Sequence, residues 1–310
     1  MHKIIPAFFW MFYLLPCLAQ QPGLDSTVQV GKKMIVLKEV VINNKLNVPA
    51  FIDRVRNDTS FYKAFRNLRI LGFTSINDIR MLRKNGTVKA ALVSRTKQIR
   101  EHNCRKMEVL AETPIGDIYD ENKNFNYYTA QLYASLFFTK DSVCGEDNIV
   151  TGREFSTEGK SGMEKHKEQL RKLFFNPGKK ISGIPFISNK TEIFDDNMAD
   201  RYDMTIDMED YNGKLCYIFS IKAKSESKGS VVIDSMTTWF DEKTFEVQGR
   251  NYSLSYDAGV YDFKVDMEVQ MTQFGQYLVP KLIRYNGNWK AAFKDRERGI
   301  FTATIYDFTQ

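Results

Sequence analysis

One segment near the C-terminus constrains the fold of this chain more than any other. In residues 261–271, YDFKVDMEVQM, apolar and polar side chains alternate strictly. Successive side chains of a β-strand point to opposite faces, so this pattern predicts a strand with one apolar face and one wet face. The apolar face must be hidden from solvent. The strand is therefore expected in a sheet that curls around a helix or closes on itself.

The neighbouring segments repeat this pattern at short, regular intervals. Strands separated by brief turns are typical of an antiparallel meander, and no strand–helix–strand rhythm indicates a parallel sheet. Asn85-Gly86 suits a tight hairpin because both residues tolerate positive φ. The expected strands are 34–42, 78–84, 87–96, 106–113, 116–119, 202–208, 215–221, 231–240, 245–256, 261–271, 277–285, 289–293 and 301–308.

Three segments are predicted to be helical. Asn47 can cap a first helix with Pro49 in its first turn, and apolar residues recur at helical spacing as far as Leu68. Residues 127–138 are rich in aromatic side chains without strand alternation, which predicts a buried helix or plug. Residues 163–174 form a further amphipathic pattern. The predicted fold class is mainly β (α+β), an antiparallel curved sheet or half-barrel with covering helices.

The first residues look like a cleavable secretory signal. A positive start at Lys3 is followed by an apolar run over residues 4–15 and by small residues up to Ala19. The run is shorter than the about 20 residues of a membrane-spanning helix. The segment LLPC, which ends at Cys17, has the outline of a lipidation site, but Pro16 stands where Gly or Ala is usual. Ordinary cleavage, and export to the periplasm or cell envelope, are expected.

These observations predict the domain organisation. Residues 1–19 are the signal peptide, 20–46 an N-terminal extension with one strand, and 47–310 a single domain with a helical insertion around 127–200. Hydrophobic residues make up 43% of the chain, which is ample for a core. The net charge of +6 comes from interspersed basic residues, which argues against nucleic acid as a partner but is compatible with a membrane surface.

Residue patterns for metal, cofactor or catalytic sites are scarce. His102 and His166 lack the partners that a zinc site needs. Residues 120–131 begin like a calcium loop, but Phe125 and Gln131 stand where that loop needs Gly and Glu. No nucleophile elbow, phosphate loop or dinucleotide fingerprint occurs. No catalytic residue, cofactor or metal site is therefore predicted.

Two groups of residues leave alternatives open. Cys104 and Cys144 can pair in an oxidising compartment, but the sequence does not give their separation, so a disulfide and two free thiols both remain open. Cys216 lies in an apolar strand and is expected to be a buried free thiol. A cluster of acidic residues near a strand invites a glycosidase interpretation, in which two carboxylates act together, although a solvated loop before a strand is the favoured interpretation. This cluster comprises Glu192, Asp195, Asp196 and Asp200.

The order of the predicted elements resembles a known superfamily. The first helix, the long meander and the segment WFDEKTFEV at 239–247, where a strand ends in an aromatic pair before an acidic turn, are similar to the lipoprotein-localisation (LolA/LolB-like) superfamily. The resemblance covers roughly residues 47–310. It implies an open half-barrel whose interior receives acyl chains, and it transfers no individual residue role. The LKEVVI segment at 37–42 also looks like exported proteins of the Bacteroidetes type.

The resemblance leads to an expected function. The chain is expected to be an exported, soluble, non-enzymatic protein that binds a lipid or a lipoprotein acyl chain. A membrane surface or an envelope protein is a further expected partner. Two alternatives are a structural or interaction protein of the cell envelope with a filled core, and a carboxylate-dependent envelope hydrolase.

The candidate lining of the cavity is the apolar face of the late strands. Such a stripe also fits an ordinary packed core. The 12 Met and 23 Phe of the chain favour a cavity slightly, because flexible thioethers adapt to acyl chains. The candidates are Leu215, Tyr217, Phe219, Tyr261, Phe263, Val265, Met267, Val269 and Met271.

Overall fold

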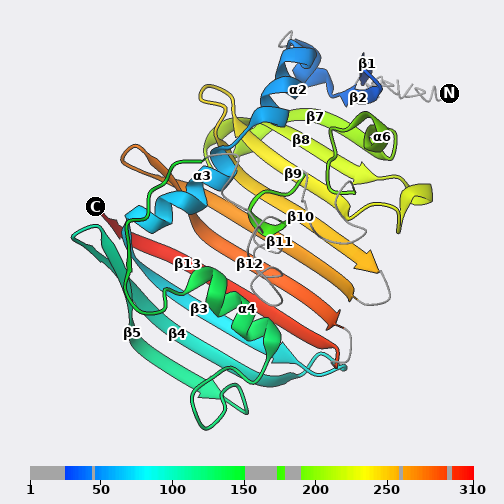
Figure 1. Ribbon diagram of the computed structural model, residues 1–310. Coiled ribbons are helices and arrows are strands. Elements are labelled where there is room, and N and C mark those ends of the chain that lie inside the picture. The colour runs from blue at the N-terminus through cyan, green and yellow to red at the C-terminus, as the bar shows by residue number, and fades with distance from the viewer. Residues whose placement is uncertain (1–24, 44–45, 151–172, 179–189, 258–260, 292–294) are drawn as a thin grey trace, which may run out of the picture.

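The computed structural model of this protein describes residues 25–43, 46–150, 173–178, 190–257, 261–291 and 295–310. Within these residues, one large curved sheet runs through the molecule without closing, and helices lie across one of its faces (Figure 1). The predicted fold class is confirmed. The described strands are β1 (Ser26–Val30), β2 (Lys33–Leu37), β3 (Gly72–Leu82), β4 (Val88–Glu101), β5 (Cys104–Ile115), β6 (Val143–Cys144), β7 (Tyr202–Tyr211), β8 (Lys214–Ala223), β9 (Ile233–Asp241), β10 (Val247–Asp257), β11 (Tyr261–Phe274), β12 (Tyr277–Ala291) and β13 (Glu297–Thr309).

The strand order places the C-terminal strand β13 between the meander and the earlier strands β3–β5. Across the sheet the order is β1-β2-β7-β8-β9-β10-β11-β12-β13-β3-β4-β5-β6. The meander from β7 to β13 is antiparallel throughout, and β13 then pairs with β3. Strand β2 pairs with β7 in parallel. The C-terminal strand therefore joins the meander to the earlier β3–β5 strands.

Strand β11 contains residues 261–271, for which the alternating pattern predicted one buried face. Phe263, Val265, Met267, Val269 and Met271 are each at most 4% exposed. The intervening Lys264 and Asp266 are exposed. One face of the strand is thus buried, as predicted. We call this face of the sheet, on which the helices lie, its inner face.

The helices lie across the inner face of the sheet (Figure 1). Asn47 caps α2, since its side chain accepts a hydrogen bond from the backbone N–H of Ala50 at 3.1 Å. The predicted single helix ends early because the carboxylate of Asp58 accepts from the N–H of Ser60 at 3.0 Å and starts a new helix. The described helices are α1 (Glu39–Asn43), α2 (Val48–Asn57), α3 (Ser60–Asn67), α4 (Tyr128–Phe137) and α6 (Asp196–Ala199), with 3-10 turns at Leu68–Ile70 and Ser225–Ser227.

The N-terminal extension differs from its prediction. It contains two strands instead of one, β1 and β2, and they extend the edge of the sheet beyond β7. The predicted strand over residues 34–42 ends at Leu37, where its last pairing with β7 lies, and α1 follows. The β-branched residues at 40–42 favour a strand only where a partner strand is available. Here the chain turns away instead.

Some predicted strands are continuous in the structure. The segments 277–285 and 289–293 were expected as two strands, but Asn286, Gly287 and Asn288 pair without interruption with β11, so β12 is one strand. Gly287 is required there because a Cβ atom would collide with the ring of Tyr285. The segment 106–113 lies within β5, whereas the strand predicted at 116–119 does not form: β5 ends at Ile115, and only Tyr119 makes an isolated bridge, to Phe125. The predicted helix over 163–174 lies almost entirely outside the described residues.

None of the helices in the described part of the chain is both long and apolar enough to cross a membrane.

Candidate functional site

Most of the sequence-predicted lining residues lie in a packed core. Phe219, Phe263, Val265, Met267, Val269 and Met271 all belong to one buried apolar cluster. Aromatic side chains fill the space above them. The ring of Phe263 stacks on Trp289 at 4.9 Å, and Phe174 meets Tyr285 and Trp289 edge-on at 5.8 and 6.2 Å. In this part of the described structure the stripe is therefore packed against side chains.

Three of the predicted lining residues lie elsewhere. Leu215 is 48% exposed, because it follows the Asn212-Gly213 turn at the very start of β8. Tyr217 is partly buried, and its ring meets Phe51 of α2 at 5.5 Å. The side chain of Tyr261 lies outside the described residues. The prediction for Leu215 is wrong, because alternation places it on the correct face but at the uncovered end of its strand.

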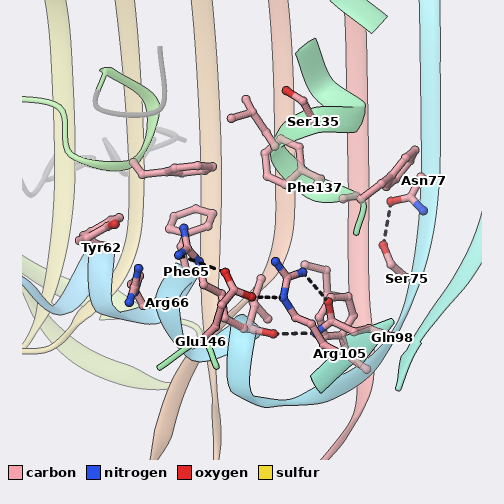
Figure 2. A pocket seen from close by; sticks show the side chains of 18 residues that line it. Tyr62, Phe65, Arg66, Ser75, Asn77, Gln98, Arg105, Ser135, Phe137 and Glu146 are labelled. Atoms are coloured by element: carbon pink, nitrogen blue, oxygen red, sulfur yellow. Dashed lines mark hydrogen bonds and ion pairs between the residues drawn. The ribbon is translucent and has the colours of Figure 1, made fainter. Parts of the chain in front are cut away.

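The structure has a pocket in a different place (Figure 2). It lies between α3 and the C-terminal end of α4, above β3, β4 and β13, and encloses about 190 Å³. We call it the α3–α4 pocket. One part of its lining is apolar and largely aromatic. These residues are Tyr62, Phe65, Leu68, Phe73, Leu136, Phe137, Phe138, Phe175, Ala303 and Ile305.

The aromatic part of the pocket is formed by residues that are distant in sequence. Phe175 contacts Phe65 at 4.4 Å between ring centroids and Phe137 at 5.9 Å. Phe137 in turn stacks on Phe301 of β13 at 5.0 Å. Residues of helix α3, helix α4 and the segment 173–175 thus pack together and form this side of the pocket, which we call the aromatic wall. Such a wall favours binding of hydrocarbon, by about 25 cal/mol for each Å² removed from water.

The other part of the lining is polar and includes Ser75, Asn77, Gln98 and Ser135. On the floor of the pocket, Ser75 donates to Asn77 at 2.8 Å. The Gln98 amide donates to the carbonyls of Leu68 and Leu71, both at 2.7 Å. Burying such groups is costly unless they are hydrogen-bonded, and here they are.

Three arginines complete the polar part of the pocket. Arg66 and Arg69 come from α3 and the turn after it, and Arg105 comes from β5. The carboxylate of Glu146 lies between two of them, 2.5 Å from Nε of Arg105 and 3.3 Å from Nη1 of Arg69 (Figure 2). Arg105 also donates to Gln98 at 3.1 Å and to Thr139. The lining therefore carries more positive than negative charge.

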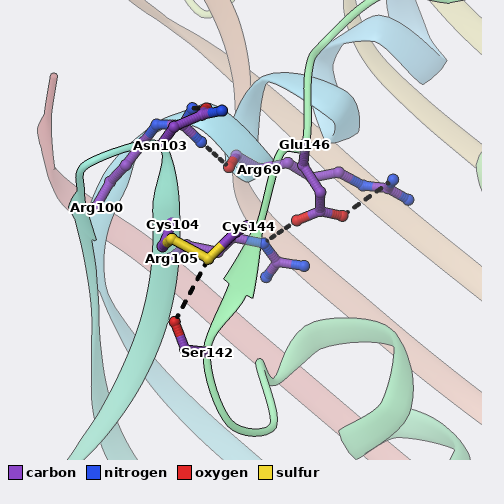
Figure 3. Close-up of a disulfide and its surroundings, with 8 residues drawn as sticks. All are labelled: Arg69, Arg100, Asn103, Cys104, Arg105, Ser142, Cys144 and Glu146. Atoms are coloured by element: carbon purple, nitrogen blue, oxygen red, sulfur yellow. Dashed lines mark hydrogen bonds and ion pairs between the residues drawn. A yellow bond between two sulfur atoms is a disulfide. The ribbon is translucent and has the colours of Figure 1, made fainter.

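A disulfide holds the segment that carries Glu146 (Figure 3). Cys144 of β6 is joined to Cys104 at the start of β5; Arg105 is the next residue of β5, and Glu146 lies two residues after Cys144, beyond the end of β6. The next residue, Asp147, pairs with Arg66 at 2.7 Å. The N–H of Ile149, and then Arg66, hold the pKa of Asp147 below its ordinary value. The segment 143–149 is thus fixed against the arginines of the pocket.

The residues considered for other chemistries have structural roles. Asp195 caps α6 by accepting from the N–H of Asn197 at 2.8 Å, and Asp196 pairs with Lys33 at 3.3 Å. Asp120 accepts from the N–H groups of Asn122 and Asn124, as in an ordinary polar turn. Among the described residues, no group of His, Cys, Asp and Glu is arranged to hold a metal ion. His166 lies outside the described residues.

No protein-family model matches this sequence, and no curated protein is similar to it at a significant level. Several solved structures are similar to this chain, among them the following two. One is an outer membrane lipoprotein-sorting protein domain from Vibrio parahaemolyticus, at 7% identity over 80% of this chain and 90% of that chain, with a TM-score of 0.25. The other is a DUF1329 family protein from Desulfovibrio piger, at 12% identity over 81% and 93%, with a TM-score of 0.24. These TM-scores are too low to say what this chain binds.

Sequence reasoning missed the α3–α4 pocket, although a signal for it exists. On β3 and β4 the inner positions hold Ser75, Asn77, Ser94, Thr96 and Gln98, all buried. The inner positions of β11 are apolar, whereas β3 and β4 carry a polar patch on the same face of the sheet. Small polar residues at alternating positions of a predicted half-buried strand are therefore a signal for a polar binding surface. The arginines gave no such signal, because Arg105 is distant in sequence from Arg66 and Arg69.

Proposed function

We propose that this chain is an exported, non-enzymatic binding protein for an apolar or amphipathic ligand, a lipid or the acyl chain of a lipoprotein. The single observation that carries this proposal is the α3–α4 pocket, where an aromatic wall is left open between two helices on the inner face of the half-barrel. The secretory pattern of residues 1–19 supports export to the periplasm or cell envelope. A membrane surface or an envelope protein would then deliver or receive the ligand.

The size of the pocket limits what it can take. Sites for drug-sized ligands usually enclose about 300–1,000 Å³. At about 190 Å³ the α3–α4 pocket is smaller, so it suits the end of a chain or a small amphiphile better than a whole two-chain lipid. The expected free energy of binding comes mainly from hydrocarbon burial, about 0.8 kcal/mol per methylene group.

Two measurements test the proposal. The first is lipid mass spectrometry of solvent extracts from the protein purified after export. The second is the fluorescence of a dansyl-labelled fatty acid, which should rise on binding and fall when an unlabelled fatty acid displaces it. The proposal is abandoned if the extracts are empty and the probe does not bind.

A matched pair of variants assigns the binding to the pocket. Ser135 of α4 lines the pocket, and Gln131 lies one turn earlier on the same helix with an exposed side chain. Ser135→Trp should fill much of the volume and weaken probe binding at least about tenfold, which corresponds to 1.4 kcal/mol. Gln131→Trp adds the same ring outside the pocket and should leave binding unchanged. Equal effects of the two variants would show that the probe binds elsewhere.

A second candidate function is supported by the filled core under β7–β12. There the stripe that was expected to line a cavity contacts Phe51 and Trp289 instead, and Phe174 packs on Trp289. This packing favours a structural or interaction protein whose partner binds outside the core. Cross-linking in cells that recovers one protein partner, together with extracts free of lipid, would support this candidate.

A further inference from the structure

We propose that the arginine part of the α3–α4 pocket binds the anionic group of an amphiphile, a carboxylate or phosphate, while the chain of that ligand lies along the aromatic wall. This proposal rests on the proposed function and names the ligand class. It predicts that charge on the ligand, in addition to hydrocarbon, determines affinity.

The first support is the balance of charge inside the pocket. Its lining contains three guanidinium groups and one carboxylate, that of Glu146, and Asp147, which pairs with Arg66 at 2.7 Å from outside the lining, still leaves one positive charge in excess. The side chains of Arg66, Arg69 and Arg105 are 12%, 32% and 18% exposed. Partly buried charges of one sign attract an opposite charge more strongly than charges in bulk water do. An excess of partly buried positive charge therefore favours an anionic ligand.

The second support is that the site already holds an oxyanion. Arg69 and Arg105 lie on either side of the Glu146 carboxylate, at 3.3 and 2.5 Å. Guanidinium groups present their N–H donors in a planar fork that matches carboxylate and phosphate oxygens. The Glu146 carboxylate thus shows where the anionic group of a ligand would be held.

The third support is a donor without an acceptor. Nε of Arg66 is buried, and no described residue accepts its hydrogen bond. A buried donor left without an acceptor destabilises the site. Local rearrangement around an added anion would give this donor an acceptor. The polar floor at Ser75, Asn77 and Gln98 extends the same hydrophilic region along the sheet.

The fourth support is the position of the aromatic wall. The ring of Phe65 belongs to α3, one residue before Arg66, and contacts Phe175 at 4.4 Å. Polar and apolar lining therefore meet within one small volume of about 190 Å³. A ligand that satisfies both must carry its charge close to a hydrocarbon chain. A free inorganic anion would use only the arginines, and a neutral lipid only the aromatic wall.

The test compares four ligands by displacement of the dansyl-labelled fatty acid from the full chain. These are dodecanoate, dodecyl phosphate, dodecanol and inorganic phosphate. The two charged amphiphiles should bind at least about tenfold more tightly than dodecanol, the gain expected from a charge-assisted hydrogen bond. Inorganic phosphate alone should bind weakly. Tighter binding by inorganic phosphate than by either amphiphile would overturn the proposal in favour of a plain phosphate site.

Two variants should change the affinity for charged amphiphiles in opposite directions, Arg105→Gln and Glu146→Gln, so that misfolding cannot explain both results. Arg105→Gln should weaken both charged amphiphiles about tenfold or more and leave dodecanol unchanged, whereas Arg80→Gln, at an exposed pair with Asp78, should change neither. Glu146→Gln removes the carboxylate that competes for Arg69 and Arg105. This variant should strengthen binding of the charged amphiphiles severalfold, a gain that a damaged fold cannot produce.

The outcomes separate this proposal from the proposed function. If all three long-chain ligands bind equally and Glu146→Gln has no effect, the pocket binds hydrocarbon but does not recognise charge, and only this proposal fails. If none of the long-chain ligands binds, the proposed function fails as well.

Discussion

At the scale of single residues, Arg250 on the inner face of β10 is a charged side chain buried in the core. Its guanidinium lies 4.3 Å from the ring centroid of Phe61 and 3.9 Å from the Asp58 carboxylate, and its Nε donates to Thr238 at 2.9 Å. Burial lowers its pKa, and Asp58 opposes this shift. Arginine at this position thus fixes the junction between α2 and α3 against the sheet.

Replacing Arg250 should be costly because it leaves a buried carboxylate without its partner. Arg250→Met keeps most of the side-chain volume and is expected to lower the free energy of unfolding by about 3–5 kcal/mol, measured by urea titration. Adding Asp58→Asn should recover part of this loss. Arg80→Met, in an exposed pair with Asp78, should cost less than about 1 kcal/mol. Equal losses at Arg250 and Arg80 would contradict the assignment.

Cys216 gives a second prediction at the residue scale. Its side chain is fully buried, and burial is the main reason that its pKa rises to about 11. The thiol is therefore protonated at pH 8 and out of reach of reagents. With Cys17 replaced by Ser, the native protein should not react with a thiol reagent at that pH. Unfolding without reductant should expose one thiol and with reductant three, because Cys104 and Cys144 are paired. Rapid reaction of the native protein would contradict the burial of Cys216.

At the scale of elements, α4 is capped by a residue from another part of the chain. The residue before the helix, Tyr127, makes no side-chain capping bond. Glu297 of β13 supplies the acceptors instead, for the N–H of Tyr128 at 3.0 Å and of Thr129 at 2.7 Å. The sequence predicts a helix at 127–138 from its composition, but a cap 168 residues away leaves no local pattern.

The Glu297 cap can be tested by its effect on stability and on α4. Glu297→Ala should lower the free energy of unfolding by about 1–2 kcal/mol, because two backbone donors and the positive end of the helix lose their partner. Glu297→Gln keeps an acceptor and should cost less. Glu121→Ala, in an exposed turn, is the control. Hydrogen exchange should show faster opening of α4 in Glu297→Ala, and unchanged exchange there would contradict the capping role.

At the scale of the whole molecule, alternation in the sequence was enough to predict the meander and its buried face. Residues 261–271 indicate which side chains turn inward, and the structure agrees. Alternation could not indicate what lies above that face, since Phe174 and Trp289 come from other elements. It also could not place β3 beside β13, because pairing between strands so distant in sequence depends on which sheet edges remain free. The alternating stripe therefore did not indicate the position of the α3–α4 pocket.

A crossed pair of substitutions tests whether the packed core and the binding pocket are separate parts of this molecule. Met267 is in the core under β11, and its replacement by Ala removes a buried side chain and leaves a cavity, so the free energy of unfolding should fall by about 2–5 kcal/mol. Because Met267 does not line the α3–α4 pocket, binding of the dansyl-labelled fatty acid should persist at temperatures where the variant is folded.

Ser135→Trp should show the converse pattern, with weakened binding of the probe but little change in unfolding free energy, because Ser135 is at the rim of a space that is already open. The two measurements together decide where hydrocarbon binds. Loss of probe binding in folded Met267→Ala, with normal binding in Ser135→Trp, would place the ligand under the C-terminal strands. The filled interior seen there would then have to open to admit it, and the aromatic wall between α3 and α4 would be ordinary packing.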